Sequence, residues 1–410
     1  MREDFFIGFL EEDFAFWKIK FPKRLLIPFL LVLAAKVAGS VFIYYGTGVA
    51  ASGTFWSDPS RVFAWDQNKV FLITGNISKW PFIFVGWDSA WYLSIMNRGY
   101  AFSPQAYTFS PGLPLFGNLF NLFLSSPLIS IALCGFVFGV IWVPIFQLLA
   151  ENYVSKRAAI ACTLLLAFSP FVFVFTTVSY TEGLVLFFTS AAWLLFQKGK
   201  RAGASALGAV AVLSRVTGVL VVLPMLYGAL KQKGKGRMRN FILSLVPVLA
   251  LISWYGYGLF SSGDLLAPVH TTEWAGLYTV PSFLLNNLPQ KGLSAFSAIS
   301  LQNWPASQFW LTPVAIAAAV FIPPFLMYKM KNMDRELLMY SVAGYVGILV
   351  FGAIVSFPRF VSVLFPLWLP LTAKLSLGKK QSFLVGMVLI AFLVLSIDMW
   401  VSFLNGQFVA

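Results

Sequence analysis

Residues 86–100, GWDSAWYLSIMNRGY, and their continuation at 107–114, YTFSPGLP, differ in character from the rest of the chain. They are polar enough to leave a lipid bilayer and aromatic enough to stay beside it, and long apolar runs surround them. Their one acidic residue is Asp88, which precedes a helical pattern of apolar side chains. We therefore expect a fold built of membrane helices, with its chemistry beginning at Asp88.

The apolar runs set the fold class. Hydrophobic residues make up 59% of the 410 residues, and charged residues only 11%. Runs of about 17–25 apolar residues, enough to cross about 30 Å of hydrocarbon, recur along the chain. A chain that crosses lipid must satisfy its backbone hydrogen bonds internally, so these runs are expected to be helices. We predict a single all-α polytopic membrane domain over residues 1–410, with about 11 transmembrane helices. The predicted spans are 25–46, 127–149, 158–178, 182–197, 204–213, 216–230, 241–260, 310–328, 335–356, 359–374 and 381–403. A single tilted span over 204–230 is the alternative to the two short helices there, and it would invert the topology downstream.

The basic residues predict how the chain lies in the membrane. Most of the 29 lysines and arginines fall in short connectors on one side of the predicted spans, as cytoplasmic loops do. Anchoring therefore explains the net charge of +14 better than nucleic-acid binding does. The N-terminus is then cytoplasmic and the C-terminus outside. Residues 1–24 are predicted to form a cytoplasmic amphipathic helix. The two outer loops are 47–126, which carries Asp88, and 261–309.

Helical spacing gives the Asp88 stretch a local structure. Positions 91, 92, 95 and 99 share one face, so residues 89–98 are predicted to form a short amphipathic helix on the outer surface. Asp88 would be its N-cap, where free backbone N–H groups favour an ionised carboxylate. Gly99 would be its C-cap. A role as cap alone is the other interpretation of Asp88.

The motif W-D-x-x-W-Y-x-x-I-x-x-x-G-Y, followed by F-x-P-x-x-P at 109–114, resembles the PIG-V-like branch of the membrane mannosyltransferases. These enzymes have the GT-C fold and are related to the enzyme that adds the second mannose of GPI anchors. Three further stretches are similar and occur in the same order. They are Ser179-Tyr180-Thr181-Glu182, Leu213-Ser214-Arg215-Val216-Thr217-Gly218, and Pro358-Arg359-Phe360 leading into Phe365-Pro366-Leu367.

The resemblance implies a donor and a reaction. The donor would be polyprenyl- or dolichyl-phosphate mannose, and the acceptor a glycolipid or glycan at the outer face. A donor with another sugar and a protein acceptor are the alternatives within this class. The transfer would be inverting, with Asp88 as the catalytic residue. A single displacement needs a carboxylate to take the proton of the acceptor hydroxyl. No carboxylate cluster accompanies Asp88, so we predict metal-independent chemistry without a cofactor.

The other candidate residues are predicted at the outer face, with Arg215, Arg359 and Glu182 at outer helix ends and His270 in the second outer loop. Arg215 and Arg359 are predicted to bind the donor phosphate, because a leaving phosphate needs cations and charge near a bilayer is costly; snorkelling to the interface is the alternative. The substrate-binding candidates are Trp87, Trp91, Tyr92, Tyr180, Glu182 and His270. For His270, an ordinary surface pair with Glu273 is the competing interpretation.

Two other function classes compete with the enzyme. One is a flippase or transporter of lipid-linked sugars. Carriers tend to have two related halves with broken spans and charges near the midplane, whereas this chain has no internal repeat and its candidate charges lie at one face. The other is an inactive relative that serves as a subunit, which the intact W-D-x-x-W-Y motif disfavours. Short loops favour a prokaryotic plasma membrane, with the endoplasmic reticulum membrane expected in a eukaryote.

Overall fold

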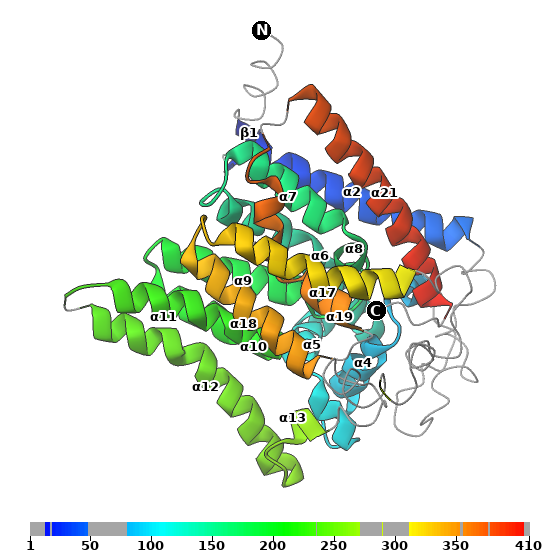
Figure 1. Cartoon of the computed structure of the whole chain (residues 1–410). Coiled ribbons are helices and arrows are strands. Elements are labelled where there is room, and N and C mark those ends of the chain that lie inside the picture. Colours follow the sequence, from blue (N-terminus) through cyan, green and yellow to red (C-terminus); the bar gives the residue numbers. More distant parts are fainter. Residues whose placement is uncertain are drawn as a thin grey trace.

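The structure, a computed structural model, describes residues 13–16, 19–47, 80–234, 236–270, 289, 311–352, 356–375 and 378–405. Most of these residues lie in helices that pack into one bundle (Figure 1). Two strands come first, β1 (Asp13–Phe16) and β2 (Ile19–Pro22). The α-helices and 3-10 helices (η), in chain order, are α2 (Lys23–Gly46), η2 (Trp80–Phe84), α4 (Asp88–Arg98), η3 (Pro104–Thr108), α5 (Gly112–Leu124), α6 (Pro127–Ala150), α7 (Lys156–Phe168), α8 (Pro170–Phe175), α9 (Glu182–Gln197), α10 (Arg201–Ser214), η4 (Val216–Val221), α11 (Val222–Lys231), α12 (Arg237–Ser262), α13 (Ala267–His270), α17 (Leu311–Met330), α18 (Arg335–Phe351), α19 (Phe357–Ser362), η9 (Phe365–Trp368), α20 (Leu369–Thr372) and α21 (Lys379–Leu404).

The N-terminal segment differs from its prediction. Where an amphipathic helix was expected over residues 1–24, β1 pairs antiparallel with β2, with Asp13 opposite Pro22. Residues 1–12 lie outside the described part. In β2, Lys20 stands between the apolar residues Ile19 and Phe21, an alternation in the strand period of two rather than the helical one. Helix begins only at Lys23, directly after β2.

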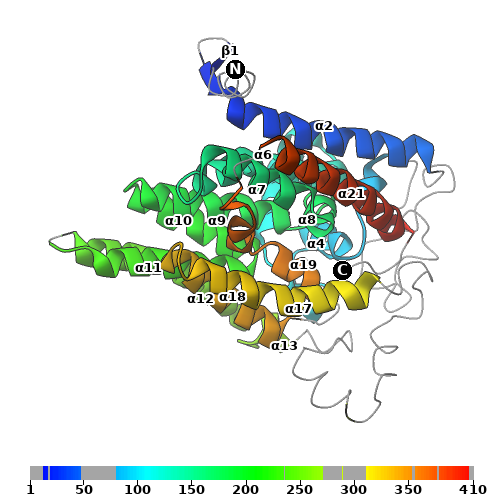
Figure 2. The same ribbon diagram turned by 45° about the horizontal axis from the view of Figure 1, so that its top comes forward.

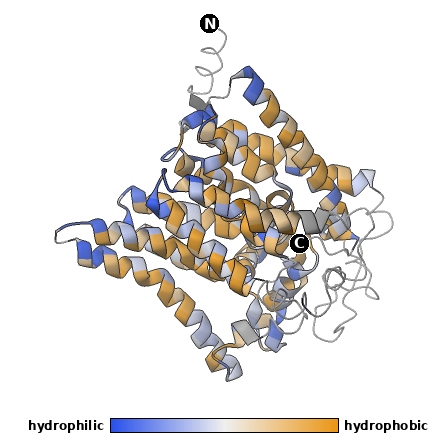
Figure 3. Cartoon of the chain, in the orientation of Figure 1, coloured by the Kyte–Doolittle hydropathy of each residue, from blue (hydrophilic) through white to orange (hydrophobic). Residues whose placement is uncertain are grey.

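Four of the described helices are long and apolar enough to cross a membrane: α2, α6, α12 and α21. Shorter apolar helices include α5, α9, α10 and the run Val216–Lys231. Figure 3 shows apolar residues along the helices and hydrophilic ones at ends such as the α11–α12 connection. These features support an integral membrane protein, while the count of about 11 spans stays a prediction.

Several predicted spans are broken into shorter pieces. The run 158–178 divides into α7 and α8 at Pro170, which lacks the N–H that a continuous helix needs. The run 359–374 divides into α19, η9 and α20. In the run 204–230, α10 ends at Ser214 and the chain folds back, because Gly218 lies against the backbone of Ala211. A Cβ atom on Gly218 would be 2.3 Å from the Ala211 carbonyl carbon, so only glycine fits this turn.

Glycine also brings α6 against the start of α9. A Cβ atom on Gly139 would lie 1.6 Å from the carbonyl oxygen of Thr176, and one on Gly183 would lie 2.8 Å from the backbone nitrogen of Gly139. The backbones of α6, of α9 and of the segment between α8 and α9 therefore touch. In Figure 2, α2 and α21 run along one edge of the bundle and α12, α17 and α18 along the other, with α6 and α9 between them. This central contact fixes the segment that begins α9.

The first outer loop, predicted at 47–126, contains helices of its own. Its residue Asp88 begins α4, with Trp87 at the cap position, so the carboxylate does not serve as the predicted N-cap. Gly99 does end the helix, as predicted, with φ 72° and its N–H bonded to the carbonyl of Ile95. Most of α4, from Ser89 to Ile95, is buried. The helix is thus packed into the bundle. The amphipathic pattern had predicted that it lies on the outer surface, and that prediction is wrong for residues 89–95.

Candidate active site

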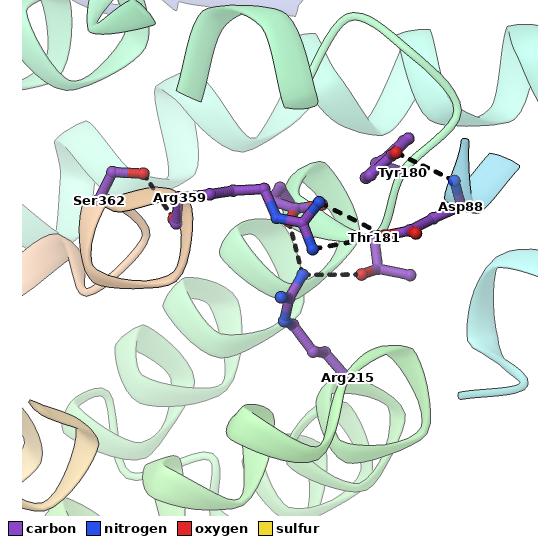
Figure 4. A network of polar contacts seen from close by, with 7 residues as sticks. Asp88, Tyr180, Thr181, Arg215, Arg359 and Ser362 are labelled. Carbon is purple, nitrogen blue, oxygen red and sulfur yellow. Dashed lines mark hydrogen bonds and ion pairs between the residues drawn. The ribbon is translucent and has the colours of Figure 1, made fainter. Parts of the chain in front are cut away.

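Four charged residues from distant parts of the chain form one cluster (Figure 4). Asp88 is the first residue of α4, and Glu182 is the first residue of α9. Arg215 lies between α10 and η4, and Arg359 lies in α19. The structure therefore brings together the predicted base, both predicted phosphate ligands and one predicted substrate-binding residue.

Glu182 holds the two arginines. Its side chain is 0% exposed, and its Oε1 atom lies 2.6 Å from Nη1 of Arg215 and 3.3 Å from Nε of Arg359. At the N-terminal end of α9, the helix dipole also favours its negative charge. Glu182 is therefore placed to position both arginines, and its predicted substrate contact stays a prediction.

Arg359 joins the two carboxylates. Both Nη atoms lie 3.4 Å from Oδ2 of Asp88, and its side chain is 9% exposed. The guanidinium carbon lies 4.8 Å from the ring centre of Phe360, 5.0 Å from that of Phe175 and 5.2 Å from that of Tyr180. Aromatic faces attract cations at such distances. Arg359 is thus held by rings and by Glu182, with its Nη atoms directed at Asp88.

Arg215 is the more open of the two arginines, with a side chain that is 17% exposed. Its Nη1 atom also donates to Oγ1 of Thr181 at 3.3 Å, and its guanidinium carbon lies 4.6 Å from the ring centre of Phe360. Arg215 also lines a narrow cavity between α9, α18 and η9. The apolar side chains of that cavity include Val185, Ile348, Leu364 and Phe365. The guanidinium group of Arg215 therefore borders a small cavity whose other lining residues are mainly apolar.

Asp88 is the loosely held carboxylate of the cluster. A third of its side chain (33%) is exposed, and its 3.4 Å contacts with Arg359 exceed the about 2.7–2.9 Å typical of charge-assisted hydrogen bonds. Its backbone N–H donates to the hydroxyl of Tyr180 at 3.1 Å. Burial raises the pKa of Asp88 above its usual value, although the positive charge of Arg359 opposes that shift. A carboxylate with a raised pKa and an exposed face is suited to accept a proton.

The aromatic candidates differ in their surroundings. Trp91 is buried and stacks on Phe109, with ring centres 5.4 Å apart, and on Phe102 at 5.9 Å. Trp91 thus packs in the core of the first outer loop, and its role in substrate binding stays a prediction. Tyr92 is buried as well, and burial raises its pKa, with the charge of Asp88 adding to the shift. Tyr92 therefore borders the charged cluster, and its role in binding stays a prediction.

Trp87 has an unusual backbone that sets the position of Asp88. Its φ is 47° and its ψ is −117°, a conformation that non-glycine residues rarely adopt. A hydrogen bond of 2.9 Å from the N–H of Ser89 to the carbonyl of Gly86 closes this tight turn. Strain of this kind costs about 1–3 kcal/mol and is concentrated at functional sites. Trp87 is half-buried, and its binding role also stays a prediction.

Two predictions lie at the edge of what the structure describes. His270 is the last residue of α13, but its side chain lies outside the described part.

The described residues contain no group of three or more His, Cys, Asp or Glu side chains that could hold a metal ion. The metal-independent chemistry remains a prediction.

Sequence reasoning named Tyr180 but missed Thr181, Phe175 and Phe360 around the charges. Thr181 binds Arg215, and Phe360 lies over both guanidinium groups. Both residues stand inside motifs that the sequence singled out, directly beside Glu182 and Arg359, so adjacency was the available signal. Phe175 lies in an apolar run outside these motifs, so no sequence pattern pointed to its contact with Arg359.

Comparisons with known proteins complete the description. A family model described as dolichyl-phosphate-mannose-protein mannosyltransferase matches residues 109–255. This range begins at the F-x-P-x-x-P motif and contains Glu182 and Arg215, but it does not include Asp88 or Arg359. No curated protein matches the chain.

The solved structures that match this chain include those of an oligosaccharyltransferase from Archaeoglobus fulgidus, at TM-scores below 0.5. The form tethered to an acceptor peptide has a TM-score of 0.46 and 15% identity, over 92% of this chain and 56% of that one. The complex with Zn and sulfate has a TM-score of 0.47 and 16% identity, over 90% and 53%. The complex with an inhibitory peptide and a dolichol-phosphate has a TM-score of 0.42 and 13% identity, over 92% and 55%. This chain therefore spans about half the length of these proteins, and its middle third is similar to a family of mannosyltransferases.

Proposed function

We propose that this protein is a glycosyltransferase that moves mannose from a polyprenyl- or dolichyl-phosphate donor to a glycolipid or glycan acceptor. The observation that carries the proposal is the cluster in which Arg359 contacts Asp88 at 3.4 Å while Glu182 holds both Arg359 and Arg215. The cluster combines a carboxylate that can accept a proton with cations that can meet an anionic leaving group. The match of residues 109–255 to a family described by its dolichyl-phosphate-mannose substrate supports the donor class.

The proposed chemistry is a single displacement at the anomeric carbon. Asp88 takes the proton of an acceptor hydroxyl, and the hydroxyl oxygen forms a bond to the anomeric carbon. The bond between that carbon and the phosphate oxygen breaks, and the lipid phosphate leaves with the electron pair. Attack from the face opposite the phosphate inverts the configuration. Asp88 is the base because it is the exposed and loosely held carboxylate, whereas Glu182 is fully buried.

The two arginines take different parts in this scheme. The contacts of Arg215 with Thr181 and Glu182 use only its Nη1 atom, and a guanidinium carries five N–H donors. Among the described residues, none accepts from its other donors, which can therefore bind phosphate oxygens. Arg359 is more enclosed and holds Asp88. We therefore assign the donor phosphate chiefly to Arg215.

Two further parts of the proposal come from the motifs and the charge pattern. The W-D-x-x-W-Y motif supports mannose, through its resemblance to the PIG-V-like mannosyltransferases. The basic connectors support a cytoplasmic N-terminus and a GT-C-type bundle of about 11 spans with its site on the outer face. A prokaryotic plasma membrane is the proposed location.

A reconstitution experiment separates the enzyme from a flippase. Purified protein in vesicles is given radiolabelled polyprenyl-phosphate mannose and a lipid extract from its source organism. The proposal predicts that label leaves the phosphate donor and appears in a new lipid or glycan product. Donor that crosses the bilayer without any new labelled product would instead establish a carrier.

A further inference from the structure

Lys36 is a fully buried lysine in the middle of α2, within a span that is otherwise strongly apolar. Its Nζ atom donates to Oγ1 of Thr176 at 2.7 Å, to Oγ1 of Thr177 at 2.9 Å and to the carbonyl oxygen of Phe173 at 3.3 Å. Among the described residues, no carboxylate pairs with it. An ionisable group inside a span is costly and usually has a function, yet Lys36 has no part in the proposed chemistry.

Three acceptors surround the Nζ atom of Lys36. The hydroxyl of Thr176 lies 2.6 Å from the carbonyl of Val172, and that of Thr177 lies 2.5 Å from the carbonyl of Phe173. When both hydroxyls donate to these carbonyls, their oxygens can accept from Nζ. Three acceptors around one nitrogen match the three N–H donors of an ammonium group. This set of acceptors holds the Lys36 side chain in place.

These acceptors lie at the start of the segment that forms the candidate active site. Thr176 and Thr177 directly follow α8, and within five residues the chain reaches Tyr180, Thr181 and Glu182. Those three residues bind the backbone of Asp88 and both arginines.

The same segment is fixed on its other sides. The Thr176 carbonyl lies against Gly139, and the N–H of Ser179 donates to the carbonyl of Phe84 at 2.8 Å. The ammonium group of Lys36 adds the polar attachment on the side of α2.

We propose that Lys36 is a positioning residue, whose three hydrogen bonds hold the turn over residues 176–182 and thereby the groups that orient Asp88, Arg215 and Arg359. Its importance for transfer rests on the proposed function. A displacement of about 1 Å in such groups can lower a catalytic rate by about 100-fold, so a residue that touches no substrate can still control turnover.

The test uses two matched pairs of variants. Lys36→Met removes the ammonium group at similar side-chain length, and Lys36→Arg keeps the charge. Thr177→Val removes one acceptor at nearly constant volume, and Thr177→Ser keeps the hydroxyl. Amide hydrogen exchange of the peptide over residues 173–184 reports on the turn in purified protein. Steady-state transfer reports kcat and the KM for the donor.

We expect faster exchange at residues 173–184 in Lys36→Met and Thr177→Val, and near wild-type exchange in Thr177→Ser. We expect kcat to fall about tenfold or more in Lys36→Met with a donor KM changed less than about threefold, since orientation is lost while phosphate binding remains. Thr177→Ser should restore kcat toward the wild-type value. If Lys36→Met does not fold, the pair at Thr177 decides alone.

Unchanged exchange in both Lys36→Met and Thr177→Val would overturn the proposal. So would faster exchange with unchanged kcat, because the turn would then not control turnover. If the wild type transfers no sugar, the proposed function fails by itself, and the exchange data still decide whether Lys36 holds the turn.

Discussion

Asp88 and Glu182 are two carboxylates at helix starts, and their surroundings give them different tasks. Glu182 is fully buried with a 2.6 Å contact to Arg215, whereas Asp88 is a third exposed with contacts of 3.4 Å to Arg359. Removing one member of a buried ion pair costs about 3–5 kcal/mol. Glu182 therefore belongs to the framework of the site, and Asp88 remains free to exchange a proton.

The pKa of Asp88 predicts how transfer depends on pH. Burial raises this pKa, and the charge of Arg359 lowers it. A base works only when ionised, so transfer should fall as the pH drops through the pKa of Asp88, above the usual range for aspartate. In Arg359→Met, the lost positive charge raises this pKa further, so the acid limb of kcat/KM should move to higher pH.

Arg215→Met is the matched control for that measurement. It should raise the KM for the donor, because Arg215 is assigned to the phosphate, and it should move the acid limb less than Arg359→Met does, since the charge of Arg215 acts on Asp88 more weakly. An acid limb that stays in place or moves to lower pH in Arg359→Met would contradict the assignment of the base.

At the level of elements, glycine contacts hold α6, α9 and the turn between α8 and α9 together. Gly139→Ala would place a Cβ atom 1.6 Å from the Thr176 carbonyl oxygen, which requires backbone movement, so the variant should melt at a clearly lower temperature and lose transfer. Gly256→Ala in α12 meets no atom within 4 Å. That control should be neutral or more stable by up to about 1 kcal/mol, because alanine favours helix over glycine. Equal melting temperatures for the two variants would show that the packing at α6 is different.

Sequence patterns predicted the helices better than they predicted how the helices pack. The apolar runs located α2, α6, α12 and α21 within a few residues, because length and hydropathy decide such helices. The amphipathic helix predicted over residues 1–24 was wrong for residues 13–22, where β1 and β2 form a hairpin. The burial of α4 was also missed, because an amphipathic pattern does not distinguish a membrane surface from a protein partner.

At the scale of the whole molecule, the candidate site joins residues far apart in the chain. Arg359 and Asp88 are separated by 271 positions, and no periodicity predicts such a contact. The family resemblance selected both residues, and the charge pattern predicts that they lie on one side of the membrane. The bridging position of Glu182 and the role of Lys36 depend on side-chain packing, which a single sequence does not reveal.

The predicted orientation can be checked with cysteines at opposite ends of α12. The natural Cys134 and Cys162 are buried, so single exposed cysteines can be labelled selectively. With the N-terminus in the cytoplasm, a membrane-impermeant maleimide on intact cells should label Ser262→Cys and leave Lys233→Cys unlabelled until the membrane is opened. The reverse pattern would place the charged cluster on the cytoplasmic side and contradict the proposed outer site.

The most direct test of the central claim compares two aspartates that each follow a tryptophan. Asp88 lies in the full W-D-x-x-W-Y motif, whereas Asp66 follows Trp65 without the rest of that motif. Purified wild type, Asp88→Asn and Asp66→Asn are given radiolabelled polyprenyl-phosphate mannose and acceptor lipids, and the rate of the first turnover is measured. We predict a loss of about 10²–10⁴-fold for Asp88→Asn, as expected for removal of a general base, with Asp66→Asn close to wild type. Transfer by Asp88→Asn at the wild-type rate would contradict the account.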